Sequence, residues 1–275
     1  RAFLLENVVG LATHDGGVMF RQVLHDLQAQ GLYEVSWKRT NTSWHGVPQN
    51  RPRLYIVGVR RDATSIKYIF PEPIDLPTIG SFLSPKSAAD NPSCRPRAPV
   101  AAGVITQASR RARDIPAGED WVVDDQISTT RGNRVTVMHN AVPCLLAARH
   151  QGYWVGSRGR RLTFHEAARL QGFRASTLTW PVGTQPFALL GNTMSLNVVM
   201  RFVLRILHTL GLHSHIADPW SDGSAIAQLQ ADASLESGPA CHSPALWPGG
   251  SIAAVCHSPA PWPGGSDGAA SLSHN

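Results

Sequence analysis

The stretch GVPQNRPRLYIVGV, residues 46–59, decides the fold that the sequence predicts. Gly46 and Pro48 indicate a tight turn. Residues 54–59 are mostly apolar and rich in β-branched side chains, as in a strand that is covered on both faces. The stretch therefore predicts a loop that leads directly into a buried strand.

Three polar residues stand at alternate positions just before that strand: Gln49, Arg51 and Arg53. Alternate residues of an extended segment point to one side. One amide and two guanidiniums would then converge at the end of a sheet, which is costly unless an anionic or acceptor-rich group binds there. The alternative is an arginine pair that makes ordinary surface salt bridges.

The preceding residues complete an α/β pattern. The sequence predicts a strand over residues 3–8, a loop over 10–17, a helix over 18–30 that ends at Gly31, and a strand over 33–37. Strand, helix, strand, loop and strand in this order are typical of the second half of an α/β sheet.

Length and composition place limits on the class of protein. The chain has 275 residues, enough for one sizeable domain and a smaller one, and 43% of them are hydrophobic. We find no apolar run near the roughly 18 residues of a membrane span, and no signal-peptide pattern. The four cysteines have no CxxC spacing, so we expect neither a disulfide framework nor a metal site. We expect an intracellular protein, in the nucleus of a eukaryote or otherwise in the cytoplasm. We also expect a fragment, because the chain begins with Arg1.

Charge is distributed unevenly along the chain. Residues 214–275 contain no Lys or Arg and five acids, so the first 213 residues hold all 25 basic and 14 of the 19 acidic residues, a net charge of +11. A basic folded part with a weakly acidic tail favours a polyanionic partner such as nucleic acid. Between Lys86 and Arg113 there are six basic residues and one acid. This proline-broken region predicts an irregular insertion that contacts phosphates, with short strands near 121–123 and 134–137.

Two helices and a tail are expected after the insertion. Thr163 and Glu166 form a capping-box pattern, so a helix begins there, and Gly172 ends it. A second helix over about 195–210 has a predicted buried stripe: Val198, Val199, Phe202, Val203, Ile206 and Leu207.

The remaining residues, 214–275, predict a disordered tail. The segments 241–251 and 256–266 match at ten of eleven positions. Two copies cannot build a solenoid, so we interpret them as a low-complexity duplication, although their two Cys-His pairs leave a shared metal site as the alternative.

Four motifs in order resemble the C-terminal half of the DNA cytosine-5 methyltransferase family. They are Glu6-Asn7-Val8, Gln49-x-Arg51-x-Arg53, the 161–173 segment with Glu166-Ala-x-Arg169-Leu-Gln-Gly-Phe, and Gly191-Asn192. The resemblance covers residues 3 to about 206. It implies the C-terminal half of a Rossmann-like catalytic domain at 1–75, a target-recognition region at 76–160, and a recognition helix with a returning catalytic helix at 161–213.

The resemblance also implies roles for single residues. Glu6 would face N3 of a flipped cytosine, Arg53 would stabilise charge developing at O2, and Arg51 would brace the site or meet phosphate. Asn7 and Gln49 would orient these groups. Two further residues, Asn192 and Thr193, would contact S-adenosylmethionine. The implied substrate is double-stranded DNA. We expect no membrane partner and no metal ligands.

Some family features are missing or altered. The Phe-x-Gly-x-Gly cofactor loop and the Pro-Cys-Gln nucleophile motif do not occur upstream of Glu6. Pro143-Cys144-Leu145 follows Arg53 and lacks the glutamine, so we interpret Cys144 as a structural cysteine and not as the nucleophile. Phe164-His165, Arg174 and the segment 193–195 also depart from the family pattern.

These absences predict that the chain alone does not methylate DNA. Two alternatives stay open, a non-catalytic DNA-binding remnant and one subunit of a split methyltransferase. In the second case a partner chain would carry the missing motifs, whereas in a truncated enzyme a missing N-terminal segment would carry them.

Overall fold

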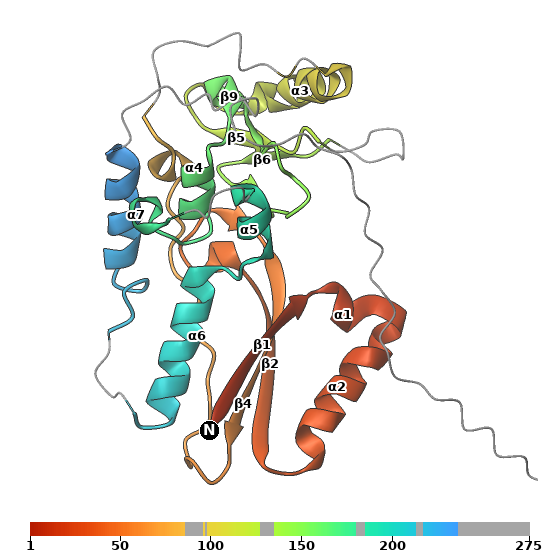
Figure 1. Cartoon of the computed structure of the whole chain (residues 1–275), viewed down its shortest axis with the longest axis vertical. Helices are drawn as coiled ribbons and strands as arrows, with labels where there is room; N and C mark the ends of the chain where they lie inside the picture. Colours follow the sequence, from red (N-terminus) through yellow and green to blue (C-terminus); the bar gives the residue numbers. More distant parts are fainter. Residues whose placement is uncertain (86–95, 97, 127–134, 180–184, 213–216, 236–275) are drawn as a thin grey trace, which may run out of the picture.

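The strand predicted from residues 54–59 is the centre of a three-stranded sheet with the order β1-β4-β2 (Figure 1). In this computed structural model, β4 (Pro52–Arg60) runs antiparallel to both β1 (Ala2–Val8) and β2 (Tyr33–Asn41). The structure describes residues 1–85, 96, 98–126, 135–179, 185–212 and 217–235. The α/β prediction for the N-terminal part is confirmed.

Helices cover the sheet on both faces, which explains why residues 54–59 of β4 are buried on both faces (Figure 1). Helix α2 (Val18–Ala29) buries Phe20 against Leu54 and Ile56. Helix α6 (Leu196–Thr209) lies on the other face, where Phe202 packs edge-on to Tyr55 at 5.0 Å between ring centroids. Successive side chains of a strand point to opposite faces, so both sets must be apolar.

The connection from β1 to α2 is more regular than the expected loop. It contains α1 (Gly10–Thr13) and the 3-10 turn η1 (His14–Gly17). Gly31 follows α2 with a φ of +67°, as the predicted helix end requires.

A second part of the molecule is built from the insertion. Its sheet has the order β6-β5-β8-β9, with β5 (Trp121–Val123) as predicted and β6 (Val137–His139) beginning later than expected. Its other strands are β8 (Trp154–Val155) and β9 (Arg160–Arg161), and its 3-10 turns are η3 (Ile79–Phe82), η5 (Ala112–Asp114) and η7 (Gly156–Arg158). Helix α3 (Pro99–Arg111) was not predicted. The many nearby prolines concealed it, although Pro99 at the first turn is compatible with a helix.

Helix α4 (Phe164–Arg169) confirms the capping box. The Thr163 hydroxyl accepts from the Glu166 amide, and the Glu166 carboxylate accepts from the Thr163 amide. Gly172 has a φ of +90° and ends the segment, as expected. The 3-10 turn η8 (Ala175–Thr177) and helix α5 (Pro186–Asn192) follow.

The predicted α6 stripe is confirmed at its centre, where Val198, Phe202 and Ile206 are buried. Val203 was assigned wrongly, because 38% of its surface is exposed. The segment Pro186–Thr209 is long and apolar enough to cross a membrane by length and composition, which our sequence reading missed. This is weak evidence for a span, since α6 packs on the sheet and carries the buried residues Asn197 and Arg201.

The expectation of a disordered tail over residues 214–275 is wrong for residues 217–235. Helix α7 (Ser224–Ser234) packs against α4 and η3, and Trp220 and Leu229 enter the main core. The Ala-, Ser- and Gly-rich composition obscured the helical spacing of Ile226, Leu229 and Ala233. Cys94, Arg134 and the duplicated tail from 236 lie outside the described residues.

Candidate active site

Glu6 and Arg53 lie together because β1 and β4 are neighbouring strands. In the antiparallel register Glu6 is opposite Tyr55 and Val8 is opposite Arg53, so both charged side chains project on the α6 face. The Arg53 Nε atom lies 3.2 Å from Glu6 Oε1, and the two side chains keep 13% and 16% of their surface exposed. The two residues to which the resemblance gives neighbouring roles therefore lie side by side, and those roles stay predictions.

Arg51 has a different environment. It is 4% exposed, and its guanidinium donates to the main-chain oxygens of Leu145 (3.0 Å), Gly191 (3.3 Å) and Thr193 (2.7 Å). The acceptors for both Nη atoms of this arginine therefore come from its own chain, while its buried Nε has no hydrogen-bond partner among the described residues. Of the two roles that the resemblance implies for Arg51, these contacts are of the bracing kind. Arg51 holds the end of α5 against the loop after Val142.

Gln49 is fully buried and also turns inward. Its amide nitrogen donates to the Leu170 oxygen and to Gln171 Oε1, both at 2.7 Å. The side chain thus fixes the loop to the end of α4. The orienting role that the resemblance implies for Gln49 stays a prediction.

Asn7 is not brought to Glu6. It is exposed, it lies on the α2 face of the sheet, and its Oδ1 accepts from the Val8 amide at 2.8 Å. Side chains alternate along a strand, so Asn7 and Glu6 project on opposite faces of the sheet.

Cys144 belongs to this site, which sequence reasoning missed. Strand β7 (Val142–Pro143) pairs in parallel with β3 (Gln49–Asn50) and delivers the next residue to the arginines. The Cys144 sulfur lies 3.5 Å from Arg51 Nη1 and 3.6 Å from Arg53 Nη2. Two-residue strands far apart in the sequence leave no pattern that would have predicted this contact. The interpretation of Cys144 as non-nucleophilic stays a prediction.

Asn192 and Thr193 lie at the end of α5 and not in a free turn. Asn192 is exposed, and its contact to S-adenosylmethionine stays a prediction. Thr193 is engaged within the chain. Its oxygen accepts from Arg51 and Gln171, and its hydroxyl donates to the Leu190 oxygen at 2.8 Å.

Burial governs the titration of two neighbours of the site. It raises the pKa of Tyr55 above its ordinary value, and the nearby Glu6 carboxylate acts in the same direction. His45 lies at the start of the loop. Burial, with the positive charges of Arg201 and Lys38, lowers its pKa from 6.5 to about 3. His45 is therefore neutral, which agrees with its Nδ1 accepting from Arg201 Nη1 at 2.7 Å.

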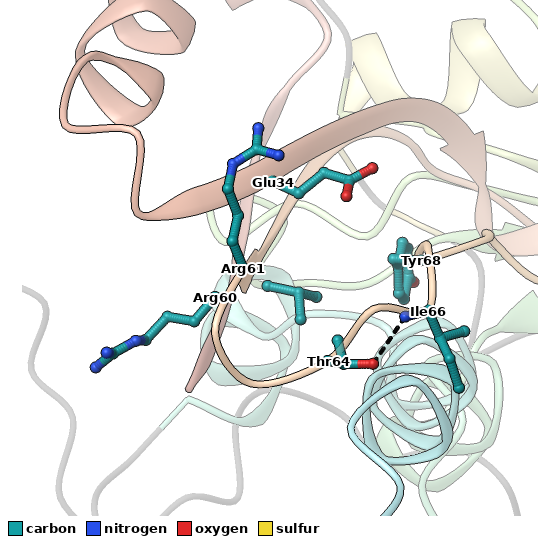
Figure 2. Close-up of a pocket in the computed structure, with 7 residues that line it drawn as sticks. Glu34, Arg60, Arg61, Thr64, Ile66 and Tyr68 are labelled. Carbon is teal, nitrogen blue, oxygen red and sulfur yellow. Dashed lines mark hydrogen bonds between the residues drawn. The ribbon is translucent and has the colours of Figure 1, made fainter.

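A small pocket at the opposite end of the sheet does not contribute to this site (Figure 2). Its volume is about 10 Å³, room for about one water molecule beside the buried hydroxyl of Tyr68. The Arg60 guanidinium points away from it in Figure 2 and pairs with Asp62. In the described part of the chain, no three His, Cys, Asp or Glu residues are grouped to hold a metal.

Comparison with known proteins places this site in a family. The model for the C-5 cytosine-specific DNA methylase family matches residues 1–208. The chain belongs to that family. The methylase domain therefore includes the sheet, the candidate site and α6, and the fold is the C-terminal half of a Rossmann-like methyltransferase.

Relatives of the methylase include bacterial type II methyltransferases. The chain is 26% identical to type II methyltransferase M.HhaI of Haemophilus parahaemolyticus over 208 residues, 75% of this chain and 63% of that protein. It is 29% identical to M.HaeII of Haemophilus aegyptius over 214 residues, 77% and 62% of the two chains. This methylase chain thus spans less than two thirds of the length of these relatives.

A shorter and closer match, 51% identity over 75 residues, occurs with M.NgoBI of Neisseria gonorrhoeae and covers 27% of this chain and 22% of that protein. Among solved structures, the Dnmt2 methyltransferase of S. pombe is 15% identical with a TM-score of 0.48, covering 76% of this chain and 68% of that one.

Proposed function

We propose that this chain is the C-terminal part of an enzyme that transfers a methyl group from S-adenosylmethionine to C5 of a flipped cytosine in DNA. The Glu6–Arg53 pair carries the proposal. C5 of cytosine is a poor nucleophile until a thiolate adds at C6, and that addition places negative charge on the N3 and O2 side of the ring. A carboxyl group and a guanidinium held side by side fit those two positions.

Each group has one task in this scheme. Glu6 shares a proton with N3 and accepts from the exocyclic amine, and Arg53 donates to O2. Arg51 and Gln49 keep the loop rigid, so that Arg53 is held in place before the base arrives. S-adenosylmethionine supplies the methyl group, and the exposed amide of Asn192 is the described side chain that fits a contact to it.

We further propose that the isolated chain does not methylate DNA. Among the described residues, β1 pairs only with β4, and its open edge has mostly apolar residues including Leu5, 43% exposed. The opposite edge, β2, has Glu34, Lys38 and Arg39, charges that discourage further pairing. An unprotected edge supports the addition of a strand by another segment or a partner chain, which would also supply the thiolate and the cofactor loop.

DNA binding is the direct test, measured by fluorescence anisotropy on duplexes with a normal or an abasic target position. Arg53→Ala should weaken binding to the duplex with a cytosine target. The control is Arg60→Ala at the far end of the same strand, where the side chain is exposed and pairs with Asp62. Equal losses in the two variants would mean that Arg53 only adds general positive charge.

Methyl transfer is measured with labelled S-adenosylmethionine. The full chain should give none alone, and should give activity with the polypeptide that supplies the missing motifs. If the chain alone transfers methyl groups and Cys144→Ser abolishes this activity, two proposals are refuted: that the isolated chain is inactive, and that Cys144 is a structural cysteine.

A further inference from the structure

Residues 217–235 lie beyond the family match, which ends at 208, yet they pack against the loop that leads to the site. Trp220 and Leu229 are 2% and 1% exposed within the main core. Ile226 lies so close to Gly46 that a Cβ at that glycine would stand 2.8 Å from the Ile226 side chain. We call residues 217–235 the C-terminal clamp.

The first anchor of the clamp is Asp218. Its Oδ2 lies 2.7 Å from Arg201 Nε, and the other end of that guanidinium donates to His45 Nδ1 at 2.7 Å. The His45 Nε2 atom lies 2.8 Å from the Thr40 hydroxyl. A charged chain of contacts therefore runs from the clamp through α6 to the start of the 45–49 loop.

The second anchor is Asp232. It is 5% exposed, and it accepts from the amides of Ala175 (2.9 Å) and Ser176 (3.2 Å). It also pairs at 3.5 Å with Arg169, which is fully buried and donates to the Phe82 oxygen. These contacts fix the position of α4 and of the turn after it.

The end of α4 then holds the site directly. Gln171 accepts from Gln49 at 2.7 Å and donates to the Thr193 oxygen at 3.0 Å. Arg51 donates to the same Thr193 oxygen at 2.7 Å. The two anchors thus reach the loop at both of its ends, through His45 at one end and Gln49 at the other.

We propose that the C-terminal clamp is a positioning element of the active site, in which Asp218 and Asp232 hold the loop that presents Arg51 and Arg53. This inference deepens the proposed function, since it assigns a role to a segment outside the matched domain. Its physical basis is that buried, charge-assisted contacts lose most when one partner is removed.

The test uses Cys144 as a local reporter, because its sulfur contacts both arginines. In the full chain with Cys94, Cys241 and Cys256 changed to Ser, the rate of reaction with DTNB measures how often the site opens. Asp218→Asn should raise this rate about tenfold, the effect of losing one charge-assisted hydrogen bond on local opening. Asp232→Asn should act in the same direction, and where it does not fold, Asp218→Asn decides.

Two control variants separate positioning from general stability. Asp222→Asn changes an exposed acid of the same segment that accepts from the Ser224 amide, and should leave the rate unchanged. Val104→Ala makes a cavity in α3, within a core cluster separate from the one that holds the clamp, and lowers global stability without touching the clamp. The proposal is refuted if the rate rises equally in Val104→Ala and Asp218→Asn, or if it rises in neither variant.

Duplex binding by the same variants distinguishes this inference from the proposed function. If Asp218→Asn raises the thiol rate but the chain binds no DNA, the clamp proposal is supported and the methylase proposal is refuted. If the chain binds DNA but Asp218→Asn leaves the thiol rate unchanged, the methylase proposal is supported and the clamp proposal is refuted.

Discussion

Gly191→Ala should destabilise the chain through a backbone collision at the end of α5. A Cβ at this position would lie 2.1 Å from the Ala147 nitrogen and 2.5 Å from the Leu146 carbonyl carbon. Favourable contacts are about 3.5–4.0 Å long, so α5 has to retreat by more than about 1 Å. Neither obstacle is a flexible side chain, and a rotamer change therefore cannot relieve the collision.

The expected cost follows from that geometry. Overpacking costs about 1–3 kcal/mol, and a backbone obstacle places this variant at the upper end, about 3 kcal/mol. The helix preference of Ala over Gly offsets roughly 0.5–1 kcal/mol. A net loss of about 2–2.5 kcal/mol lowers the Tm by roughly 4–10 °C in a chain of this size. The retreat of α5 also lengthens the contact between Arg51 and the Gly191 oxygen, now 3.3 Å.

Thermal unfolding followed by tryptophan fluorescence measures the effect, with Gly103→Ala as the matched control. Gly103 lies in α3 with nothing within 4 Å of its Cβ position. That substitution should raise stability by about 0.5–1 kcal/mol through helix propensity alone. If Gly191→Ala melts at the same temperature as Gly103→Ala, the close approach of α5 to residues 146–147 is not a feature of the folded protein.

Three further outcomes are expected. Because the pKa of His45 falls from 6.5 unfolded to about 3 folded, the unfolded chain binds the proton first as the pH drops, and urea unfolding should show roughly 2 kcal/mol less stability at pH 5 than at pH 7.5. His45→Gln should remove that part of the pH dependence. Arg169→Met leaves the buried Asp232 carboxylate without this partner and should cost about 3–5 kcal/mol in urea unfolding, while Arg169→Met with Asp232→Leu should recover part of it. In the completed enzyme, Arg53→Lys keeps the charge but loses the planar fork beside Glu6. It should lower kcat about 100-fold or more in a methyl-transfer assay, with a smaller change in DNA affinity.

Only the family resemblance implied that Glu6 and Arg53 act on the same ring, whereas the two strands that carry them could be predicted from clear local patterns. The contacts of Arg51 could not. Its three acceptors are main-chain oxygens at residues 145, 191 and 193, and every residue type has such an oxygen. The place of Cys144 was also hidden, because it depends on a two-residue parallel pairing between β3 and β7.

The sequence by itself determined the elements that carry a strong local signal. The apolar run of β4, the helix that ends at Gly31 and the capping box at Thr163 each depend on residues close in the chain. Tertiary structure alone decided how those elements meet. It placed the thiol of Cys144 between two guanidiniums and folded residues 217–235 back onto the core. The Cys144 contacts join residues 91 and 93 positions apart, and those of Asp232 join residues 56 to 63 positions apart. The energies of such contacts depend on burial and geometry that no local pattern encodes.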